Sequence, residues 1–381
     1  MRGFIFFIII VLSVYGGTNF YIARRSFQWL NAVLPGLSGK IFAIIYICIA
    51  LSMFLGFSPL PPGIKRIAGW ISSHWMGVYV YLLFFILLAD IIILAGSLLK
   101  IIPSPIPHNI RFYTGIIVIA LTIGFIGYGK FNASRISLVS YDVQTEKTSL
   151  ERDLKIALIS DLHLGSVNSE KNLERVVYGV NKLEADIVCL AGDIFNDDIN
   201  SIRNPAGTTD LLKSINSTYG VYACLGNHDA GKTFNEMLRF LEESNVKLLK
   251  DEYVIIDEKL ALFGRLDPSP IGGFAGLERK DVTDMIKSID PGLPILVMDH
   301  NPANIGEYGG EVDLILSGHT HKGQIFPANL ITKAIYTVDY GYYRKDSGSP
   351  QVIVTSGAGT WAMPMRIGTN NEIVSITLRK K

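Results

Sequence analysis

The sequence has few charged residues, few cysteines and no excess of either charge. Only 18% of the 381 residues are charged and 49% are hydrophobic, whereas an average soluble domain is about 25% charged. This balance excludes a disordered chain and an extended charged coiled coil. The formal net charge of +1 argues against a general nucleic-acid binder, which carries a large basic excess, so no nucleic-acid partner is expected. The three cysteines lack Cys-x-x-Cys spacing and are interpreted as small buried hydrophobic residues.

Acidic residues are almost missing from residues 1–131. This region holds nine of the 35 Lys and Arg residues but only one of the 34 acidic residues, Asp90. It also contains four long apolar runs, at residues 4–23, 41–60, 76–99 and 112–131. Each run is long enough as a helix, at about 1.5 Å per residue, to cross a hydrocarbon core of about 30 Å. The basic residues lie between or beside the runs, so we predict a region of four transmembrane helices in an integral membrane protein.

Several features of this region allow more than one interpretation. The first run is interpreted as an uncleaved helix and not a signal peptide, because Ile-Ala-Arg-Arg at its end is no small-x-small cleavage site. Asp90 lies inside the third run, where it would either bind a lipid headgroup or ion, or pair with a polar side chain of a neighbouring helix. The basic residues divide equally between the two sides, which leaves the orientation open.

The pattern changes after residue 131. Residues 132–152 are polar and are predicted to be a connector, with a first strand at 136–143. Residues 153–381 are predicted to form one domain with strands at 155–160, 187–190, 221–225, 253–256, 260–263, 294–298, 312–316, 352–355 and 373–378. Helices are predicted at 170–183, 210–215, 233–244 and 281–289. This alternation indicates a layered α/β fold.

Asp, Asn or His residues follow five of the predicted strands. They are Asp161 and His163, then Asp193, then Asn227 with His228, then His300, and last His319 with His321. Because α/β folds place their sites at the carboxyl ends of strands, these side chains are expected to converge. Carboxylate, amide and imidazole groups suit Mn²⁺, Fe²⁺ or Zn²⁺, and the imidazole content is too high for Ca²⁺. Seven ligands are too many for one tetrahedral ion but suit two divalent ions that share a carboxylate and clamp a phosphoryl group.

The motifs also occur in a familiar order. Asp161-Leu-His163, Gly192-Asp193, Gly226-Asn-His-Asp229, His300 and Gly318-His-Thr-His321 resemble the motifs of calcineurin-like metallophosphoesterases. More narrowly, residues 318–324, 356–360 and 365–372 resemble the membrane-associated bacterial branch, which includes enzymes that cleave UDP-2,3-diacylglucosamine. The resemblance covers the chain from about residue 155 onward. It implies a four-layer α/β/β/α sandwich and a bacterial plasma-membrane location.

The resemblance also implies roles for the site residues. One metal would be bound by Asp161, His163, Asp193 and His321, and the other by Asp193, Asn227, His300 and His319. Asp193 would bridge the ions, and His228 would act as general acid or oxyanion stabiliser. The sequence departs from the family where an Asp usually orients the catalytic His: Asn196 stands there and Asp197 follows. Either residue could support His228.

We therefore predict a membrane-anchored, dinuclear, metal-dependent phosphohydrolase. Hydroxide activated by the metals would attack a phosphodiester, pyrophosphate or phosphomonoester, and the anchor favours a lipid-linked substrate at the bilayer surface. The alternative is a catalytically weak membrane sensor or scaffold. Four basic loop residues would each either contact a substrate phosphate or lie on the solvated surface; they are Lys322, Arg265, Arg344 and Arg366. The apolar stretch Trp361, Met363, Pro364 and Met365 would either meet acyl chains or be a loop packed on the core. The substrate and the oligomeric state do not follow from the sequence.

Overall fold

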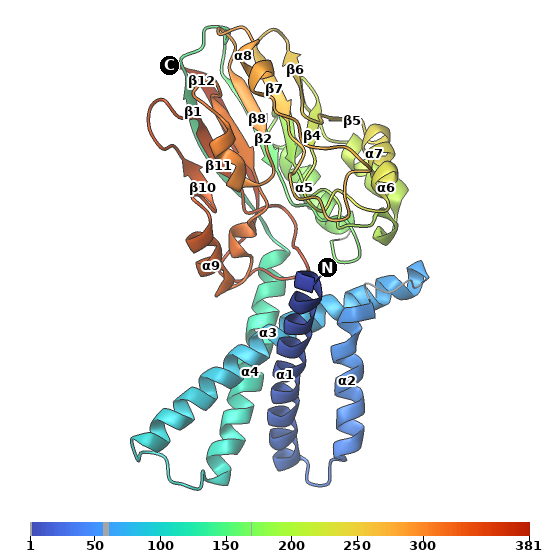
Figure 1. The fold of residues 1–381 in the computed structure, drawn as a ribbon, viewed down its shortest axis with the longest axis vertical. Coiled ribbons are helices and arrows are strands. Elements are labelled where there is room, and N and C mark those ends of the chain that lie inside the picture. The colour runs from blue at the N-terminus through green and yellow to red at the C-terminus, as the bar shows by residue number, and fades with distance from the viewer. Residues whose placement is uncertain (1, 56–60, 169) are drawn as a thin grey trace. The chain divides into compact units, whose positions relative to one another are not determined.

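The structure is a computed structural model, and it describes residues 2–55, 61–168 and 170–381. The chain divides into two compact units, Met1–Gly129 and Lys130–Lys381 (Figure 1). The family motifs all lie in the second unit. The boundary falls inside a helix, so the second unit begins with the last turn of that helix.

The first unit is helical. Its helices are α1 (Arg2–Val33), α2 (Gly39–Leu55), α3 (Pro62–Leu98) and α4 (His108–Ala133), whose last residues belong to the second unit. Each predicted apolar run lies in one of these helices, except that residues 56–60 of the second run are outside the described residues. Among the described residues, Gly63–Leu98 and His108–Ala133 are long and apolar enough to cross a membrane, and Gly39–Phe54 is a shorter apolar helix. The four-span arrangement stays a prediction.

The outward surface of these helices is apolar. Ile44 of α2, Ile91 of α3 and Ile123 of α4 are all more than half exposed. Water-facing helices carry polar residues on such surfaces, whereas lipid-facing helices expose aliphatic side chains. This exposure, together with the length of the helices, supports membrane association.

Asp90 has partners within the first unit. Its Oδ2 accepts hydrogen bonds from Nε and Nη2 of Arg25, at 2.9 and 2.5 Å, and from the hydroxyl of Tyr21. Arg25 and Tyr21 lie on α1, so the acid links α3 to α1. The structure thus supports the interpretation in which Asp90 pairs with polar side chains of a neighbouring helix.

The second unit contains two six-stranded sheets. The first has the order β1 (Ile136–Thr145), β12 (Asn371–Lys380), β2 (Leu154–Ile159), β3 (Ile187–Ala191), β4 (Val221–Cys224) and β5 (Val246–Leu248). The second has the order β10 (Gly341–Tyr343), β11 (Gln351–Val354), β9 (Leu314–Ser317), β8 (Ile295–Met298), β7 (Leu260–Gly264) and β6 (Glu252–Ile256). The helices are α5 (Glu170–Asn181), α6 (Pro205–Lys213), α7 (Phe234–Glu243), α8 (Thr283–Lys287) and α9 (Ala328–Ile335).

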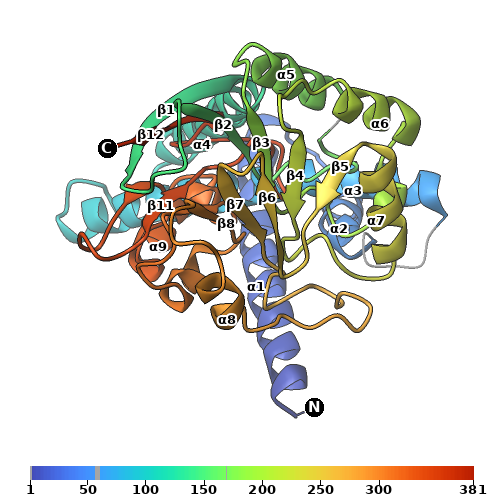
Figure 2. The same cartoon turned by 90° about the horizontal axis from the view of Figure 1, so that it is seen from above.

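Three layers of buried side chains hold this unit together. One lies between the first sheet and helices α5 to α7, and includes Val176, Leu190 and Met237. A second lies between the two sheets, and a third joins the second sheet to α8. Seen from above, α5, α6 and α7 lie outside one sheet, and α8 lies outside the other (Figure 2). The predicted four-layer α/β/β/α sandwich is confirmed.

Most predicted elements are present, with shifted ends. The predicted hairpin is β6 paired with β7 in antiparallel register. The strand in the predicted connector is β1, which pairs in parallel with β12 and is therefore part of the first sheet. Helix α6 begins at Pro205 and not at residue 210, because Asn204 caps it by accepting from the Gly207 N–H and Pro205 suits the first turn. The short elements β5, β10 and α9 were not predicted.

Candidate metal centre

The five predicted strand ends converge, as the sequence analysis expected. β2, β3 and β4 are parallel neighbours in the first sheet, and β8 and β9 are parallel neighbours in the second. Each ligand follows its strand within three residues or in the next short turn. Since the two sheets face each other, their carboxyl ends bring seven side chains into one buried site.

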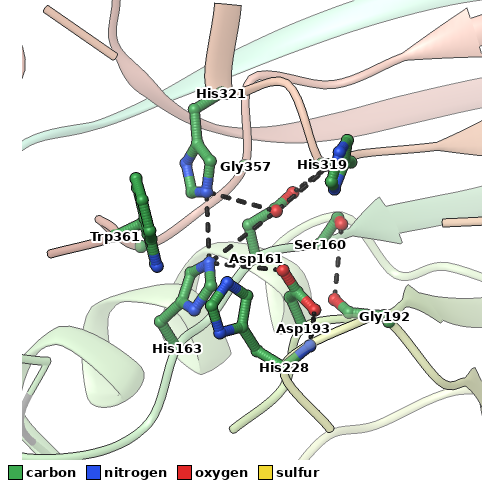
Figure 3. Close-up of polar contacts among 12 residues, drawn as sticks. Ser160, Asp161, His163, Gly192, Asp193, His228, His319, His321, Gly357 and Trp361 are labelled. Carbon is green, nitrogen blue, oxygen red and sulfur yellow. Dashed lines mark hydrogen bonds and ion pairs between the residues drawn. The ribbon is translucent and has the colours of Figure 1, made fainter. Parts of the chain in front are cut away.

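Two groups of ligands form within this site. The first contains Asp161, His163 and His321. Nε2 of His163 lies 3.1 Å from Nε2 of His321, and the latter lies 3.3 Å from Oδ1 of Asp161. Two imidazole nitrogens and a carboxylate oxygen therefore point at a common place, as the close-up shows (Figure 3).

The second group contains Asp193, His300 and His319. Oδ2 of Asp193 lies 3.1 Å from Nε2 of His300 and 3.6 Å from Nε2 of His163, a member of the first group. One carboxylate oxygen thus stands between the two groups, where a bridging ligand would stand. The Asn227 amide oxygen lies 3.0 Å from Nδ1 of His319, which places it beside the second group.

The histidine chemistry fits a metal. Nδ1 of His300 lies 2.8 Å from the Ala191 carbonyl oxygen, which can only accept, so Nδ1 carries a proton. Its Nε2 is buried, makes no hydrogen bond of regular geometry among the described residues, and lies 3.1 Å from Oδ2 of Asp193. A buried imidazole nitrogen beside a carboxylate is the arrangement that a divalent ion completes.

The pKa values of the histidines fit as well. Burial lowers the pKa of His163 to about 3 and that of His319 to about 4, so both rings are neutral and offer a lone pair. Burial also lowers the pKa of His300, but Asp193 and Asp161 outweigh it and raise the pKa well above the usual value. The carboxylates therefore attract positive charge to this place, and a divalent ion would replace that proton.

The backbone around the ligands is strained. Five of the seven ligands have positive φ angles between 45° and 69°: Asp161, His163, Asp193, His319 and His321. Non-glycine residues rarely adopt this conformation, and it concentrates at functional sites. The neighbouring glycines leave room for the ligands, since a Cβ on Gly226 would stand 2.2 Å from Oδ1 of Asp193. Strand ends alone therefore do not aim these side chains; the strained turns after them do.

His228 lies beside the ligands. Its ring centre is 5.1 Å from that of His163, and its backbone N–H donates to Oδ1 of Asp193 at 2.9 Å. Nδ1 of His228 lies 2.7 Å from Oδ1 of Asp197. Of the two residues that could support His228, Asp197 is therefore the one that contacts it. Asn196 instead donates its backbone N–H to the carbonyl of Leu164. Burial lowers the pKa of His228, but the hydrogen bond to Asp197 helps to raise it overall.

Two arginines for which a phosphate contact or a surface position was predicted, Arg265 and Arg366, are buried. Arg366 is fully buried, and its Nη2 donates to the carbonyls of Ser356 and Gly359, each at 2.6 Å. Its Nη1 donates to the His321 carbonyl at 2.9 Å, so Arg366 holds the turn that carries this ligand. Arg265 is buried and forms an ion pair of 2.8 Å with Asp251. The prediction of a surface position is therefore wrong for both arginines. Their partners are carbonyls and an acid that the fold brings next to them.

The remaining loop residues divide between core and surface. Met365 is fully buried, whereas Trp361 is exposed and lies with its ring centre 5.8 Å from that of His228. Nζ of Lys322 lies 3.9 Å from the ring centre of Tyr340. Arg344 donates to the carbonyls of Ser347 and Ser349. Of the predicted apolar stretch, Trp361 alone is classed as exposed.

The family described as calcineurin-like phosphoesterase matches residues 154–323, which include all seven predicted ligands and His228. An uncharacterized metallophosphoesterase of Campylobacter jejuni is 30% identical over 394 residues, which cover 99% of each chain. The chain belongs to the calcineurin-like metallophosphoesterase family. The resemblance seen in the motifs is therefore confirmed at the level of the family.

Two further relatives match different shares of this chain. An uncharacterized metallophosphoesterase of Aquifex aeolicus is 29% identical over 264 residues, which cover 69% of this chain and 98% of the relative. A transmembrane protein with metallophosphoesterase domain of Danio rerio is 28% identical over 329 residues, 81% of this chain and 73% of the relative. The chain is accordingly a metal-dependent phosphoesterase, with two candidate groups of metal ligands and membrane association.

Proposed function

We propose that this protein is a membrane-anchored, dinuclear phosphohydrolase of a bacterial plasma membrane that cleaves a lipid-linked phosphoester or pyrophosphate at the bilayer surface. The observation that carries the proposal is the position of Asp193 Oδ2, 3.1 Å from the His300 nitrogen and 3.6 Å from the His163 nitrogen. A carboxylate shared by two ligand groups is the arrangement that holds a pair of divalent ions.

The ligands would divide between two ions. Asp161, His163 and His321 would hold one, His300, His319 and Asn227 the other, and Asp193 both. Nitrogen and oxygen donors suit Mn²⁺, Fe²⁺ or Zn²⁺. When bound, such ions supply Lewis-acid activation of water and of the phosphoryl oxygens.

His228 would protonate the leaving group. Asp197 occupies its Nδ1, so Nε2 is the atom that can deliver a proton. The Asp197 carboxylate stabilises the imidazolium form that makes this delivery possible. The backbone N–H of His228 fixes Oδ1 of Asp193, which ties the position of the acid to that of the shared carboxylate.

A lipid-linked substrate is supported by the anchor. A domain that follows a spanning helix directly meets substrates in the lipid layer at high local concentration. Trp361, exposed beside His228, offers an apolar contact next to the reacting phosphoryl group.

The test compares the full-length protein with its Asp193→Asn variant. Metal content by mass spectrometry and Mn²⁺-dependent hydrolysis of a chromogenic phosphodiester are measured on both. We expect two ions per wild-type chain, fewer in the variant, and loss of hydrolysis. Unchanged hydrolysis in the variant would refute the shared carboxylate. Two ions per chain without turnover on a broad phosphoester panel and on lipid extracts would favour the sensor or scaffold.

A further inference from the structure

Helix α9 of the second unit turns its apolar side outward. Leu330, Ile331 and Ile335 are 57%, 59% and 70% exposed, whereas Asn329 and Thr332 on the other side are partly buried. The Thr332 hydroxyl donates to Oδ2 of Asp339 at 2.9 Å on the inner side. A helix on a soluble domain buries its apolar stripe and exposes its polar one, so α9 is reversed. Such a reversed face indicates a nonpolar phase or partner outside the domain.

We propose that α9 and Trp361 insert into the lipid layer and hold the metal centre against the bilayer surface. The partner is a lipid bilayer with anionic headgroups, met by a second, interfacial contact in addition to the apolar helices. The contact does not depend on the proposed reaction, since it would serve a domain that only binds metal.

Helix α9 is connected to the end of α4, a candidate spanning helix. The last turn of α4 belongs to the second unit, and Nδ2 of Asn132 donates to the carbonyls of Arg366 and Thr369, at 3.1 and 2.7 Å. In the same segment, the Ile367 carbonyl accepts from the Phe326 N–H at 2.8 Å, two residues before α9. One short segment thus joins the last turn of α4 to the start of α9, so α9 begins close to the point where a candidate spanning helix ends.

The segment that contains α9 carries a positive charge, which suits anionic headgroups. Residues 321–345 contain four basic residues, Lys322, Lys333, Arg344 and Lys345, against one acidic residue, Asp339. Trp361 is linked to the segment before α9, since its backbone N–H donates to Oε1 of Gln324 at 2.8 Å. An apolar helix face with nearby basic residues and a tryptophan is typical of an interfacial membrane contact. A partner protein surface is not required by any of these features.

Helix α9 is tightly packed against the turn that carries the candidate ligand His321. A Cβ on Gly323 would stand 2.3 Å from the backbone of Asn329, so α9 packs directly on the turn that carries His321. At the other end, the hydroxyl of Thr320 donates to the Asp339 carbonyl at 2.6 Å. The position of α9 in the lipid layer would therefore fix the position of the ligand turn.

The experiment measures immersion depth by spin labelling. Full-length protein is placed in nanodiscs of phosphatidylethanolamine and phosphatidylglycerol, in which both faces of the bilayer are accessible. In a Cys48→Ser background, Cys189 and Cys224 stay buried, and a label is introduced at Ile331→Cys, Lys333→Cys or Ile335→Cys. The matched control is Tyr178→Cys on α5, which at 62% exposure is as open as Ile331.

Collisions with oxygen and with a water-soluble nickel chelate are compared. We expect oxygen to dominate at 331 and 335, the chelate to dominate at 178, and position 333 to lie between. Chelate access at 331 and 335 equal to that at 178 would place α9 in water and overturn the proposal. Shielding from both agents, with dipolar coupling between labels, would reveal a second copy on this face and also overturn it. Depth is read without turnover, so failure here is distinct from failure of the proposed hydrolysis.

Discussion

Replacing Asp197 by alanine should lower kcat while leaving the metals in place. Oδ1 of Asp197 lies 2.7 Å from Nδ1 of His228, but 46% of the Asp197 side chain is exposed. A hydrogen bond to a charged group contributes about 1.5–3 kcal/mol, and this exposure reduces the value to roughly 1–1.5 kcal/mol. At about 1.4 kcal/mol for each tenfold change, kcat should fall about 5- to 15-fold. His228→Ala, which removes the acid itself, should cost roughly 10²- to 10⁴-fold.

The assay uses purified full-length protein loaded with Mn²⁺ and a series of phosphodiesters whose leaving groups differ in basicity. If His228 protonates the leaving oxygen, the loss caused by Asp197→Ala should grow as the leaving group becomes more basic. Asn196→Ala is the matched control and should change kcat less than about twofold, because its side chain is not the partner of His228. Metal content should be unchanged in both variants. A larger loss in Asn196→Ala, or a loss independent of the leaving group, would show that the reasoning is wrong.

Two further predictions concern the cysteines and Asp90. Burial raises the pKa of Cys189 to about 12 and that of Cys224 well above its usual value, so neither thiol should react with a maleimide at pH 8 in the folded protein, and both should react after denaturation, as peptide mass spectrometry can show. Asp90→Asn should lower the melting temperature in detergent by removing the charged partner of Arg25, with a loss of about 1–3 kcal/mol. The double variant Arg25→Gln and Asp90→Asn should recover part of that loss.

The convergence of the candidate ligands could be predicted because it depends on strand ends. Parallel strands bring their carboxyl ends to one edge, so Asp161, Asp193 and His300 converge once the strands are recognised. The strands could be recognised from apolar runs of four to six residues, and the candidate ligands from the motifs that follow them. The helix ends were less accurate, since α6 begins at a capping Asn-Pro pair and not where its apolar residues begin.

The support of His228 could not be predicted from composition or spacing. Asp197 has a φ of 62°, and in this left-handed conformation its carboxylate points at His228. A sequence pattern shows that Asn196 and Asp197 are adjacent, but it does not show which of them turns toward the ring. Arg366 is a similar case, because the carbonyls that bind it come from the loop between β11 and β12, which belong to different sheets.

Helix α9 shows a further limit of sequence reasoning, which is also why its surface is informative. Periodicity reveals that a helix has an apolar side, but not whether that side faces the domain or the outside. In α5, the apolar residues Leu173, Val176 and Val177 are buried, as the ordinary rule requires. In α9, no residue is buried and the apolar residues face out. Because the two helices belong to the same domain, the contrast concerns their surroundings: α5 has a sheet to cover, whereas α9 needs a nonpolar phase that the domain itself does not supply.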